Sequence, residues 1–274
     1  MVVESESTKD ESVIDVQDLV TYYGTRKILD QVNLKVRSGE IMVIMGGSGS
    51  GKSTLLRHML ALNQPAAGAI RLFGKDPSKL SAPQLHAIRQ RMGVSFQNGA
   101  LFNSLNVEEN VAFPLREHTR LDENTIRIMA RMKLEVVNLA GFEKLMPSQL
   151  SGGMVKRAAL ARAIVMDPSL LFFDEPSAGL DPVVSADLDE LILRLRDAMK
   201  VTIVVVTHEL DSAFRIADRI LVLDKGKVLI LGTVDEVKSS DNKRVQNLLN
   251  RKSEDVIVNP DEYLQRLTDD LAGL

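Results

Sequence analysis

A glycine-rich loop directly follows the apolar run Ile41–Met45, and few folds accommodate this combination. The loop and the residue after it read Gly46, Gly47, Ser48, Gly49, Ser50, Gly51, Lys52, Ser53 and Thr54. This spacing matches the phosphate-binding loop, in which a buried strand turns through glycines into a helix. Glycines let successive backbone N–H groups turn inward around phosphate oxygens, where a Cβ would obstruct them. Lys52 is predicted to reach the β- and γ-phosphates and Ser53 to ligate Mg²⁺, so we assign the whole run to a nucleotide site and call residues 46–53 the phosphate loop.

A second apolar run, residues 170–173, ends in two carboxylates, Asp174 and Glu175. In open α/β sheets ligands bind at the carboxyl ends of the strands, so this pair is expected beside the phosphate loop. Asp174 is predicted to be an outer-sphere partner of Mg²⁺, and Glu175 to orient and polarise an attacking water. A strand that ends in Asp-Glu is by itself as often a solvated turn. The phosphate loop in the same chain favours the catalytic interpretation.

Three further side chains are assigned to the same site. His208 follows the apolar run 201–207 and is predicted to bind the γ-phosphate or the attacking water, as a second catalytic residue. Gln97 follows another apolar strand and is predicted to join the shell of the metal or of the water, where it would also sense a partner. Tyr23 is predicted to stack on an adenine, with Tyr22 as its substitute, while ordinary packing of either tyrosine stays open.

A second anion site is predicted where Ser151, Gly152 and Gly153 precede the helical run 154–166. Ser151 has the chemistry of an N-cap, and the two glycines expose N–H groups at the positive end of a helix. Because the phosphates already have a cradle in the phosphate loop, this second site is predicted to serve the nucleotide of another copy. A head-to-tail pair with a two-fold axis would then hold two nucleotides. The alternative is an ordinary helix start, since Ser-Gly-Gly is common in isolation.

Composition and charge exclude several kinds of site and argue against some partners. The chain has 274 residues and no cysteine, which excludes disulfides, thiolate catalysis and cysteine-based zinc sites and favours a reducing compartment. Lys plus Arg is 34 and Asp plus Glu is 37, and the resulting formal charge of −3 gives no support for a nucleic-acid partner. Its apolar runs are far shorter than the roughly 20 residues that span a bilayer. We therefore expect a chain that crosses no membrane.

The order of strands and helices indicates one large domain with additions. Residues 1–12 are expected to be a flexible leader, and short antiparallel strands are expected just after it, up to Val36. Apolar strands then alternate with amphipathic helices, which predicts a mainly parallel α/β sheet with helices on both faces. The domain is predicted to span residues 13–240, with a helical insertion at about residues 98–150, and residues 241–274 are expected to form a helical extension.

In their order and spacing, these motifs resemble those of the ATP-binding-cassette (ABC) ATPases over about residues 13–235. The resemblance implies a P-loop NTPase of the RecA-like type, with a parallel α/β core, an antiparallel β subdomain and an inserted α-helical subdomain. It also implies ATP and Mg²⁺ as ligands, Gln97 as the Q-loop and residues 177–181 as the D-loop at the dimer contact. His208 corresponds to the switch histidine, and the family's catalytic glutamate is present at Glu175.

One position departs from the family pattern, because the residue after Ser-Gly-Gly is usually Gln and is Met154 here. The departure affects only a contact near the start of the helical run 154–166. Together with residues 113–119 and 146–148, Met154 resembles the branch that serves phospholipid transport across the bacterial envelope, the ATPases of the Mla (maintenance of lipid asymmetry) systems. Tyr23 matches the adenine-stacking position of the family.

The same resemblance implies partners and a location. A second copy and an integral membrane permease are expected, together with an accessory cytoplasmic subunit and a lipid-carrier component that binds the substrate, at the cytoplasmic face of the bacterial inner membrane. The main rival is a soluble ABC-type ATPase of DNA repair or translation, which commonly carries a long coiled-coil insertion or two cassettes. A P-loop small-molecule kinase is a second rival, but it has no use for a second anion site at residues 151–153.

Two apolar groups suggest where partners bind. Leu101, Phe102, Phe113 and Pro114 are predicted to line a dock for the permease, and the alternative is that they form the small core of the insertion. In the tail, one helical stripe is predicted to pack on the partner copy or an accessory subunit, or else on its own domain. Its members are Leu264, Leu267, Leu271 and Leu274.

Overall fold

The computed structural model describes residues 12–251. Its strands are β1 (Ser12–Tyr23), β2 (Arg26–Arg37), β3 (Ile41–Met45), β4 (Ala67–Leu72), β5 (Met92–Ser95), β6 (Leu170–Asp174), β7 (Thr202–Val206), β8 (Arg219–Asp224) and β9 (Lys227–Gly232). Its α-helices are α1 (Lys52–Met59), α2 (Ala82–Arg89), α3 (Val107–His118), α4 (Glu123–Val136), α5 (Gly152–Ile164), α6 (Pro182–Met199), α7 (Leu210–Ile216), α8 (Val234–Lys238) and α9 (Lys243–Leu249). Two 3₁₀ helices are η1 (Pro77–Lys79) and η2 (Pro147–Gln149). Ser12, assigned to the leader, begins β1, and the predicted leucine stripe of the tail lies outside the described residues.

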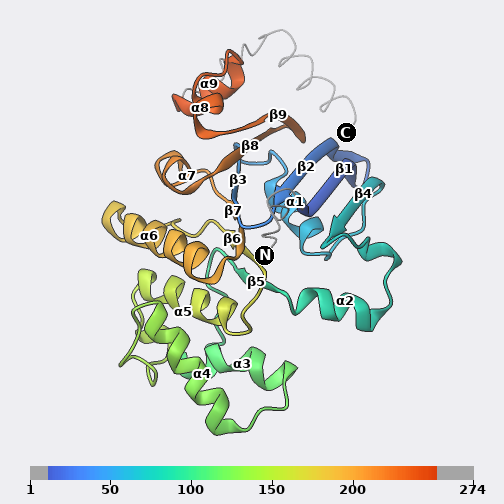
Figure 1. Ribbon diagram of the computed structural model, residues 1–274. Coiled ribbons are helices and arrows are strands. Elements are labelled where there is room, and N and C mark those ends of the chain that lie inside the picture. The colour runs from blue at the N-terminus through green and yellow to red at the C-terminus, as the bar shows by residue number, and fades with distance from the viewer. Residues whose placement is uncertain (1–11, 252–274) are drawn as a thin grey trace, which may run out of the picture.

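Six strands form the central sheet in the order β5-β6-β7-β3-β8-β9. All neighbouring strands are parallel except β8 and β9, which form an antiparallel pair. Every residue of β3 is buried, because the sheet is covered on both faces, and this explains its unbroken apolar sequence. The prediction of a mainly parallel α/β sheet is confirmed (Figure 1).

A smaller antiparallel sheet, in the order β2-β1-β4, forms the predicted β subdomain. β1 and β2 have 12 residues each, so the expectation of short strands is wrong. The reason is an irregularity in β1 at Asp18, whose φ is 44°, which shifts the register between Val16 and Leu19. This shift returns Leu19 to the buried face although it breaks the alternation in the sequence.

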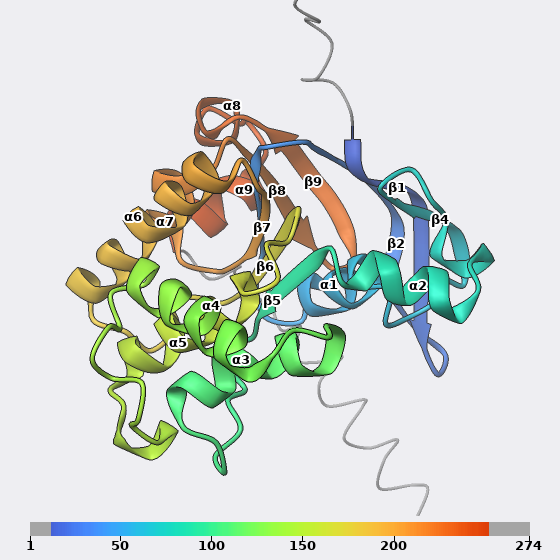
Figure 2. The ribbon, with the colours of Figure 1, turned by 60° about the horizontal axis from the view of Figure 1, so that its bottom comes forward.

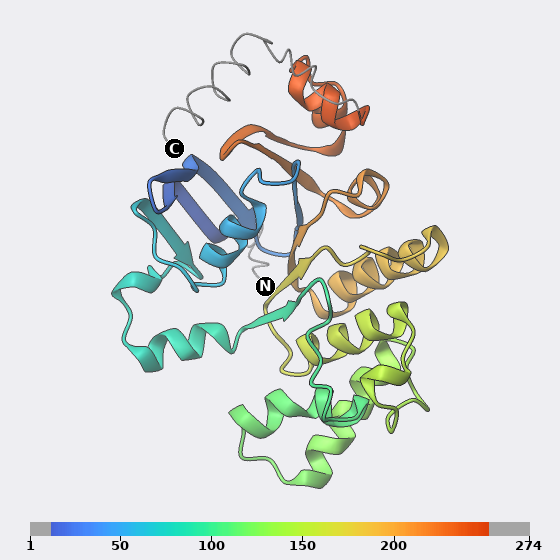
Figure 3. The same cartoon turned by 180° about the vertical axis from the view of Figure 1, so that it is seen from behind.

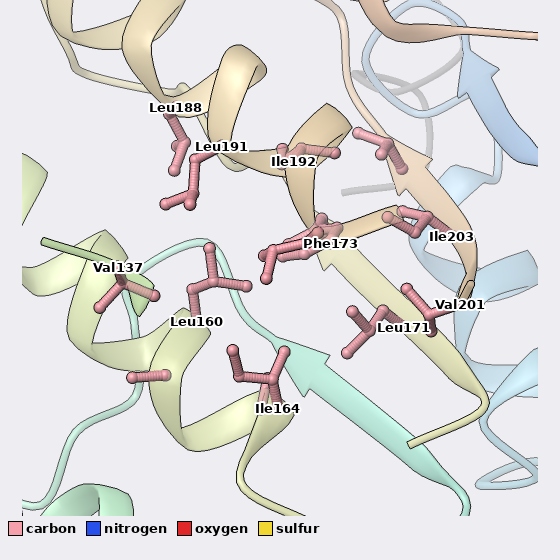
Figure 4. Packing of buried hydrophobic residues seen from close by; sticks show 14 of the residues in the cluster. Val137, Leu160, Ile164, Leu171, Phe173, Leu188, Leu191, Ile192, Val201 and Ile203 are labelled. Carbon is pink, nitrogen blue, oxygen red and sulfur yellow. The ribbon is translucent and has the colours of Figure 1, made fainter. Parts of the chain in front are cut away.

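Helices and the second sheet cover the two faces of the central sheet, so alternate residues of its strands enter two different cores. Phe173 packs in one core with Leu160 of α5 and Leu191 of α6 (Figure 4). Phe172 points to the other core, which contains α1 residues such as Leu55 and the buried residues of the antiparallel sheet. Seen from the front and from behind, α1 lies beside the antiparallel sheet, and α3, α4 and α5 lie at the opposite end (Figures 1 and 3).

The inserted segment is helical, as predicted, and its helices have well-defined starts. Asn106 caps α3 and forms a reciprocal capping box with Glu109. Asp122 caps α4 by accepting from the N–H groups of Asn124 and Thr125. α5 packs against both α3 and α4 and also against β5 of the central sheet (Figure 2). This helix therefore joins the insertion to the core.

Candidate functional site

The register of the parallel strands brings the predicted residues together at one edge of the sheet. Ile44 of β3 pairs with Val206 of β7, and Val206 also pairs with Asp174 of β6. The chain leaves these strands through the phosphate loop, through His208 and through Glu175. The carboxyl ends of the three strands therefore present all three groups on the same side of the sheet, as the sequence predicted.

The phosphate loop is shaped by close packing against β8 and by the start of α1. A Cβ built on Gly46 would lie 2.1 Å from the carbonyl oxygen of Leu223, so this position admits no side chain. Gly51 is the N-cap of α1, and no side chain accepts a hydrogen bond from the first N–H groups of this helix. These groups form an anion-binding helix end, and the phosphate loop, which ends at Ser53, together with Thr54 after it fits the triphosphate of ATP.

The Lys52 ammonium lies over the phosphate loop. Its Nζ donates to the carbonyl oxygen of Gly46 at 2.8 Å and to that of Gly47 at 3.1 Å. Burial lowers the pKa of Lys52, and the negative charges of Glu175 and Asp174 oppose this shift. The ammonium thus lies between the loop and the carboxylates, where it can bind the β- and γ-phosphates.

Tyr23 and Tyr22 end β1 with different surroundings. The Oη of Tyr23 accepts from Arg57 of α1 at 3.5 Å, and hydrogen bonding to Thr54 is the main reason that the pKa of Tyr23 is lowered. Tyr22 instead lies within 5.9 Å of Lys27. Tyr23 has 47% of its surface exposed, so its ring is available beside the helix that starts in the phosphate loop. These surroundings favour Tyr23 over Tyr22 as the residue that contacts the adenine. The stacking of Tyr23 on adenine stays a prediction.

The Glu175 carboxylate is held by the end of β7. Its Oε2 accepts from the Thr207 hydroxyl at 3.1 Å and from the backbone N–H of His208 at 3.3 Å. Its Oε1 lies 2.9 Å from Nδ1 of His208. His208 was predicted to bind the phosphate or the water, and its ring contacts the predicted base. Three groups from the two residues that follow β7 therefore orient one buried carboxylate.

Asp174 lies next to this carboxylate and is partly buried. Burial is the main reason that the pKa of Asp174 is raised, and the negative charge of Glu175 raises it further. The positive charges of Lys52 and Lys156 oppose both effects. Carboxylate, hydroxyl and amide oxygens suit Mg²⁺, so Asp174, Ser53 and Gln97 are chemically able to hold this ion together with the phosphates.

Gln97 begins a loop that side chains of α3 and α5 hold by hydrogen bonds. The buried Asn110 of α3 accepts from the N–H of Phe102 at 2.7 Å and donates to the carbonyl oxygens of Phe102 and Leu105. Arg162 of α5 donates to the carbonyl oxygen of Ala100 at 2.8 Å. Gln97 is exposed, and its loop has fixed contacts with both α3 and α5. The role of Gln97 in sensing a partner stays a prediction.

Sequence reasoning missed two residues that touch this site. Thr207 was assigned only to a strand, although a hydroxyl at the carboxyl end of that strand was the available signal. Lys156 is buried, and its Nζ donates to the carbonyl oxygen of Glu175 at 2.9 Å and to that of Gln97. Its position on a helix with basic neighbours resembles a solvated face, so no signal in the sequence separated it from surface lysines.

The predicted second anion site lies at the start of α5. Ser151 is the N-cap of this helix, and its Oγ accepts from the N–H of Met154 at 3.3 Å. Ser151 and Gly152 are exposed, and a Cβ on Gly153 would lie 2.8 Å from Val184 of α6. The Met154 side chain packs against the core, which accounts for an apolar residue where the family usually has Gln.

Comparisons with known proteins agree with this geometry. A model of the ABC transporter family matches residues 29–178. A Haemophilus influenzae protein named intermembrane phospholipid transport system ATP-binding protein MlaF is 45% identical over 244 residues, which cover 89% of this chain and 92% of that protein. A Mycobacterium leprae protein named probable ribonucleotide transport ATP-binding protein mkl is 41% identical over 237 residues, which cover 86% of this chain and 68% of that protein.

Among solved structures, the ATP-binding cassette MJ0796 in a dimeric post-hydrolysis state, bound to ADP and Pi, superposes with a TM-score of 0.74 and 31% identity. The match covers 81% of this chain and 98% of that one. The fold is thus that of an ATP-binding cassette of known structure.

Proposed function

The chain belongs to the ABC transporter family, and from this premise we propose that it is the ATP-hydrolysing subunit of a system that moves phospholipid across the bacterial cell envelope. The observation that carries the ATPase activity is the meeting of Lys52, Glu175 and His208 at one edge of the sheet. The phospholipid substrate is supported by the 45% identity to the phospholipid transport protein over nearly the whole of both chains.

The residues at this edge divide the chemistry of hydrolysis between them. Lys52 and the N–H groups at the start of α1 bind the phosphates, and Tyr23 stacks on the adenine. Glu175 accepts a proton from the water that attacks the γ-phosphorus, and Thr207 and His208 keep its carboxylate aimed. Oxygens of Ser53 and Gln97, with Asp174 in the outer sphere, would hold Mg²⁺, which would supply positive charge against the phosphates.

Two copies complete each site in this proposal. Ser151 caps an exposed helix start on the insertion, while the phosphate loop belongs to the core. In a head-to-tail pair, the helix start of one copy meets the nucleotide bound by the other, so ATP draws the copies together and hydrolysis releases them. The known cassette structure that superposes on this chain is a dimer, which supports the arrangement.

A complementation experiment tests this shared site. Lys52→Ala should prevent phosphate binding in one copy, and Ser151→Glu should repel the nucleotide of the partner. Each variant alone is expected to be inactive. A mixture should regain activity, because half of the sites in a mixed dimer combine an intact phosphate loop with an intact Ser151. Activity of either variant alone, or none in the mixture, would reject the shared site.

In this proposal a membrane permease binds the subunit and uses the cycle of ATP binding and hydrolysis to move the phospholipid. No helix in residues 12–251 is long and apolar enough to cross a membrane. The candidate dock contains an aromatic pair, Phe102 and Phe113, whose ring centroids are 4.7 Å apart, and Phe102 has 44% of its surface exposed. A cavity of about 370 Å³ lies beside it, lined in part by Pro114 and Arg162. Leu101 packs on the core, which agrees with the alternative for this residue alone.

The proposal also includes a location and further partners. With a permease as its dock, this subunit would lie at the cytoplasmic face of the inner membrane. An accessory cytoplasmic subunit and a lipid-carrier component are proposed as further partners, because the resemblance of residues 113–119, 146–148 and Met154 to the Mla branch implies them. Purification from membranes should therefore recover this chain with an integral membrane protein and bound phospholipid. Recovery of the chain without a membrane partner would reject the transporter assignment and favour the soluble ATPases.

Reconstitution of that purified complex in vesicles tests the substrate. ATP is expected to drive transfer of a fluorescent phospholipid, while ribonucleotide transport, the activity named for the mycobacterial relative, should be absent. Phe102→Asp should abolish transfer and leave the basal ATPase rate intact. Phe142→Asp is a matched control, because Phe142 is 41% exposed and lies outside the dock. ATP-driven ribonucleotide transport without lipid transfer would replace the phospholipid assignment.

A further inference from the structure

A buried lysine on α5 makes contacts that none of the nucleotide motifs explains. Lys156 has only 8% of its surface exposed, and its two acceptors are main-chain carbonyls rather than carboxylates. Burial lowers the pKa of Lys156, and the negative charges of Glu175 and Asp174 oppose this shift. Burying an ammonium costs free energy unless fixed polar groups replace its water, so this lysine requires these carbonyls to stay in place.

One of the two carbonyls belongs to a residue with a strained backbone. Glu175 has a φ of 49°, in the left-handed region that a residue with a side chain rarely adopts. Such a conformation persists only when the surroundings hold it. The N–H of Glu175 donates to the carbonyl oxygen of Val206 at 2.8 Å, and its own carbonyl oxygen accepts from Lys156 at 2.9 Å. β7 therefore holds one end of this residue, and α5 holds the other.

The second carbonyl belongs to Gln97, at the start of the loop that leads to the candidate dock. Gln97 and Glu175 follow neighbouring strands, β5 and β6, so a single ammonium lies within reach of both chain exits. Its helix is also the one that begins at Ser151. The base and the loop that begins at Gln97 thus meet at this side chain, on the helix whose start is the second anion site.

We propose that Lys156 is a positioning residue, which fixes the main chain of Glu175 and Gln97 and so aims the carboxylate that activates water. Without its two hydrogen bonds, the peptide after Glu175 is free to rotate and the left-handed conformation relaxes. The carboxylate then leaves the position that Thr207 and His208 define. This role rests on ATP hydrolysis and not on the transported molecule, so a failed phospholipid assay leaves it intact.

Lys156→Met in the full chain tests the proposal, because it keeps most of the buried volume and removes the donors. The value of kcat for ATP hydrolysis is expected to fall between about tenfold and 100-fold, the cost of a small misplacement of a reacting group. The KM and the affinity for a fluorescent ATP analogue should stay at the values of the unmodified protein. Lys156→Arg, which retains several donors, should restore most of kcat. Lys133→Met, which removes a lysine of α4 paired with Asp167, is the matched control.

A double variant separates positioning from a general loss of structure. If Lys156 acts through Glu175, then Lys156→Met should not slow hydrolysis further in a Glu175→Gln background. Multiplication of the two effects would overturn the proposal, and so would an unchanged kcat, a loss of nucleotide affinity or a failure of Lys156→Arg to rescue. If Lys156→Met lowers the Tm, Lys156→Leu, which also has no donor, replaces it in the same comparison, with the same expected loss and the same non-additivity.

Discussion

The two halves of the ATP site within one chain are built in different ways. The phosphate loop is local, because one short stretch supplies the glycines, the lysine and the helix start, and backbone sterics hold it against Leu223. Glu175 is instead held by residues from distant segments of the chain. Thr207 and His208, which follow β7, bind its carboxylate, and Lys156 of α5 binds its carbonyl oxygen. The first half therefore depends on which residues occupy a motif, and the second depends on the packing of the whole domain.

This difference predicts how each half fails. Damage to the phosphate loop should remove nucleotide binding. Damage around Glu175 should leave binding in place and remove turnover, because none of its supporting contacts involves the loop residues that surround phosphate.

Glu175→Gln should lower kcat by about 10³-fold, in the range that general base catalysis provides, while ATP affinity persists. Because hydrolysis opens the pair, the variant should also accumulate as a dimer in the presence of ATP. Phosphate release and size-exclusion chromatography measure the two effects. Glu40→Gln is the control, since Glu40 is equally buried, at 8% exposure, at the other end of the sheet. Normal turnover by Glu175→Gln would remove this residue from the role of base.

Gly46→Ala should lower ATP affinity by about 100-fold, because the added Cβ forces a shift of the loop away from Leu223. Gly47→Ala should lose far less affinity, since a Cβ there meets no atom within 4 Å. Titration with a fluorescent ATP analogue compares the two variants. Equal losses would show that the loop is sensitive to any side chain and not to this contact.

Thr207→Val should lower kcat by about tenfold, the usual value of a hydrogen bond to a charged group, with little change in ATP affinity. The substitution keeps the shape of the side chain and removes the donor to Glu175. Thr202→Val on the same strand removes a hydroxyl that accepts from the N–H of Gly39 at 2.9 Å, and it should lower the Tm without changing kcat. A fall in affinity equal to the fall in kcat for Thr207→Val would contradict the division into two halves.

Asp174→Asn should raise the Tm by roughly 2–4 °C at neutral pH while impairing Mg²⁺-dependent hydrolysis. The raised pKa of Asp174 means that the fold favours its neutral form, so ionisation costs stability as pH rises through the folded pKa. Asn carries no such cost, so its advantage in thermal unfolding should grow as pH rises above 3.8, the ordinary pKa of an aspartate, and level off once Asp174 is ionised in the folded protein. Asp197→Asn should show the opposite sign, because Arg196 lowers the pKa of Asp197. An advantage that shrinks with pH would refute this account.

The contrast between the halves also explains what the sequence could predict. The phosphate loop, the N-cap at Ser151 and the buried strand β3 are encoded by neighbouring residues, and all three have the predicted structure. Lys156 and Thr207 were missed because their importance depends on strands that come together only in the folded chain. The length of β1 was misjudged for a local reason, since its bulge hides the alternation that identifies a strand.

The helix α5 carries Ser151 at its tip and Lys156 five residues later, only about 7 Å further along the axis at 1.5 Å per residue. A helix is stiff over this length, so any push on the tip by a neighbouring molecule's nucleotide displaces the ammonium by a similar amount. In a pair of such chains, α5 would connect the nucleotide bound by the partner copy to the water-activating carboxylate of its own site. Hydrolysis at one site would then change the rate at the other through this helix, without a signal that passes through the membrane.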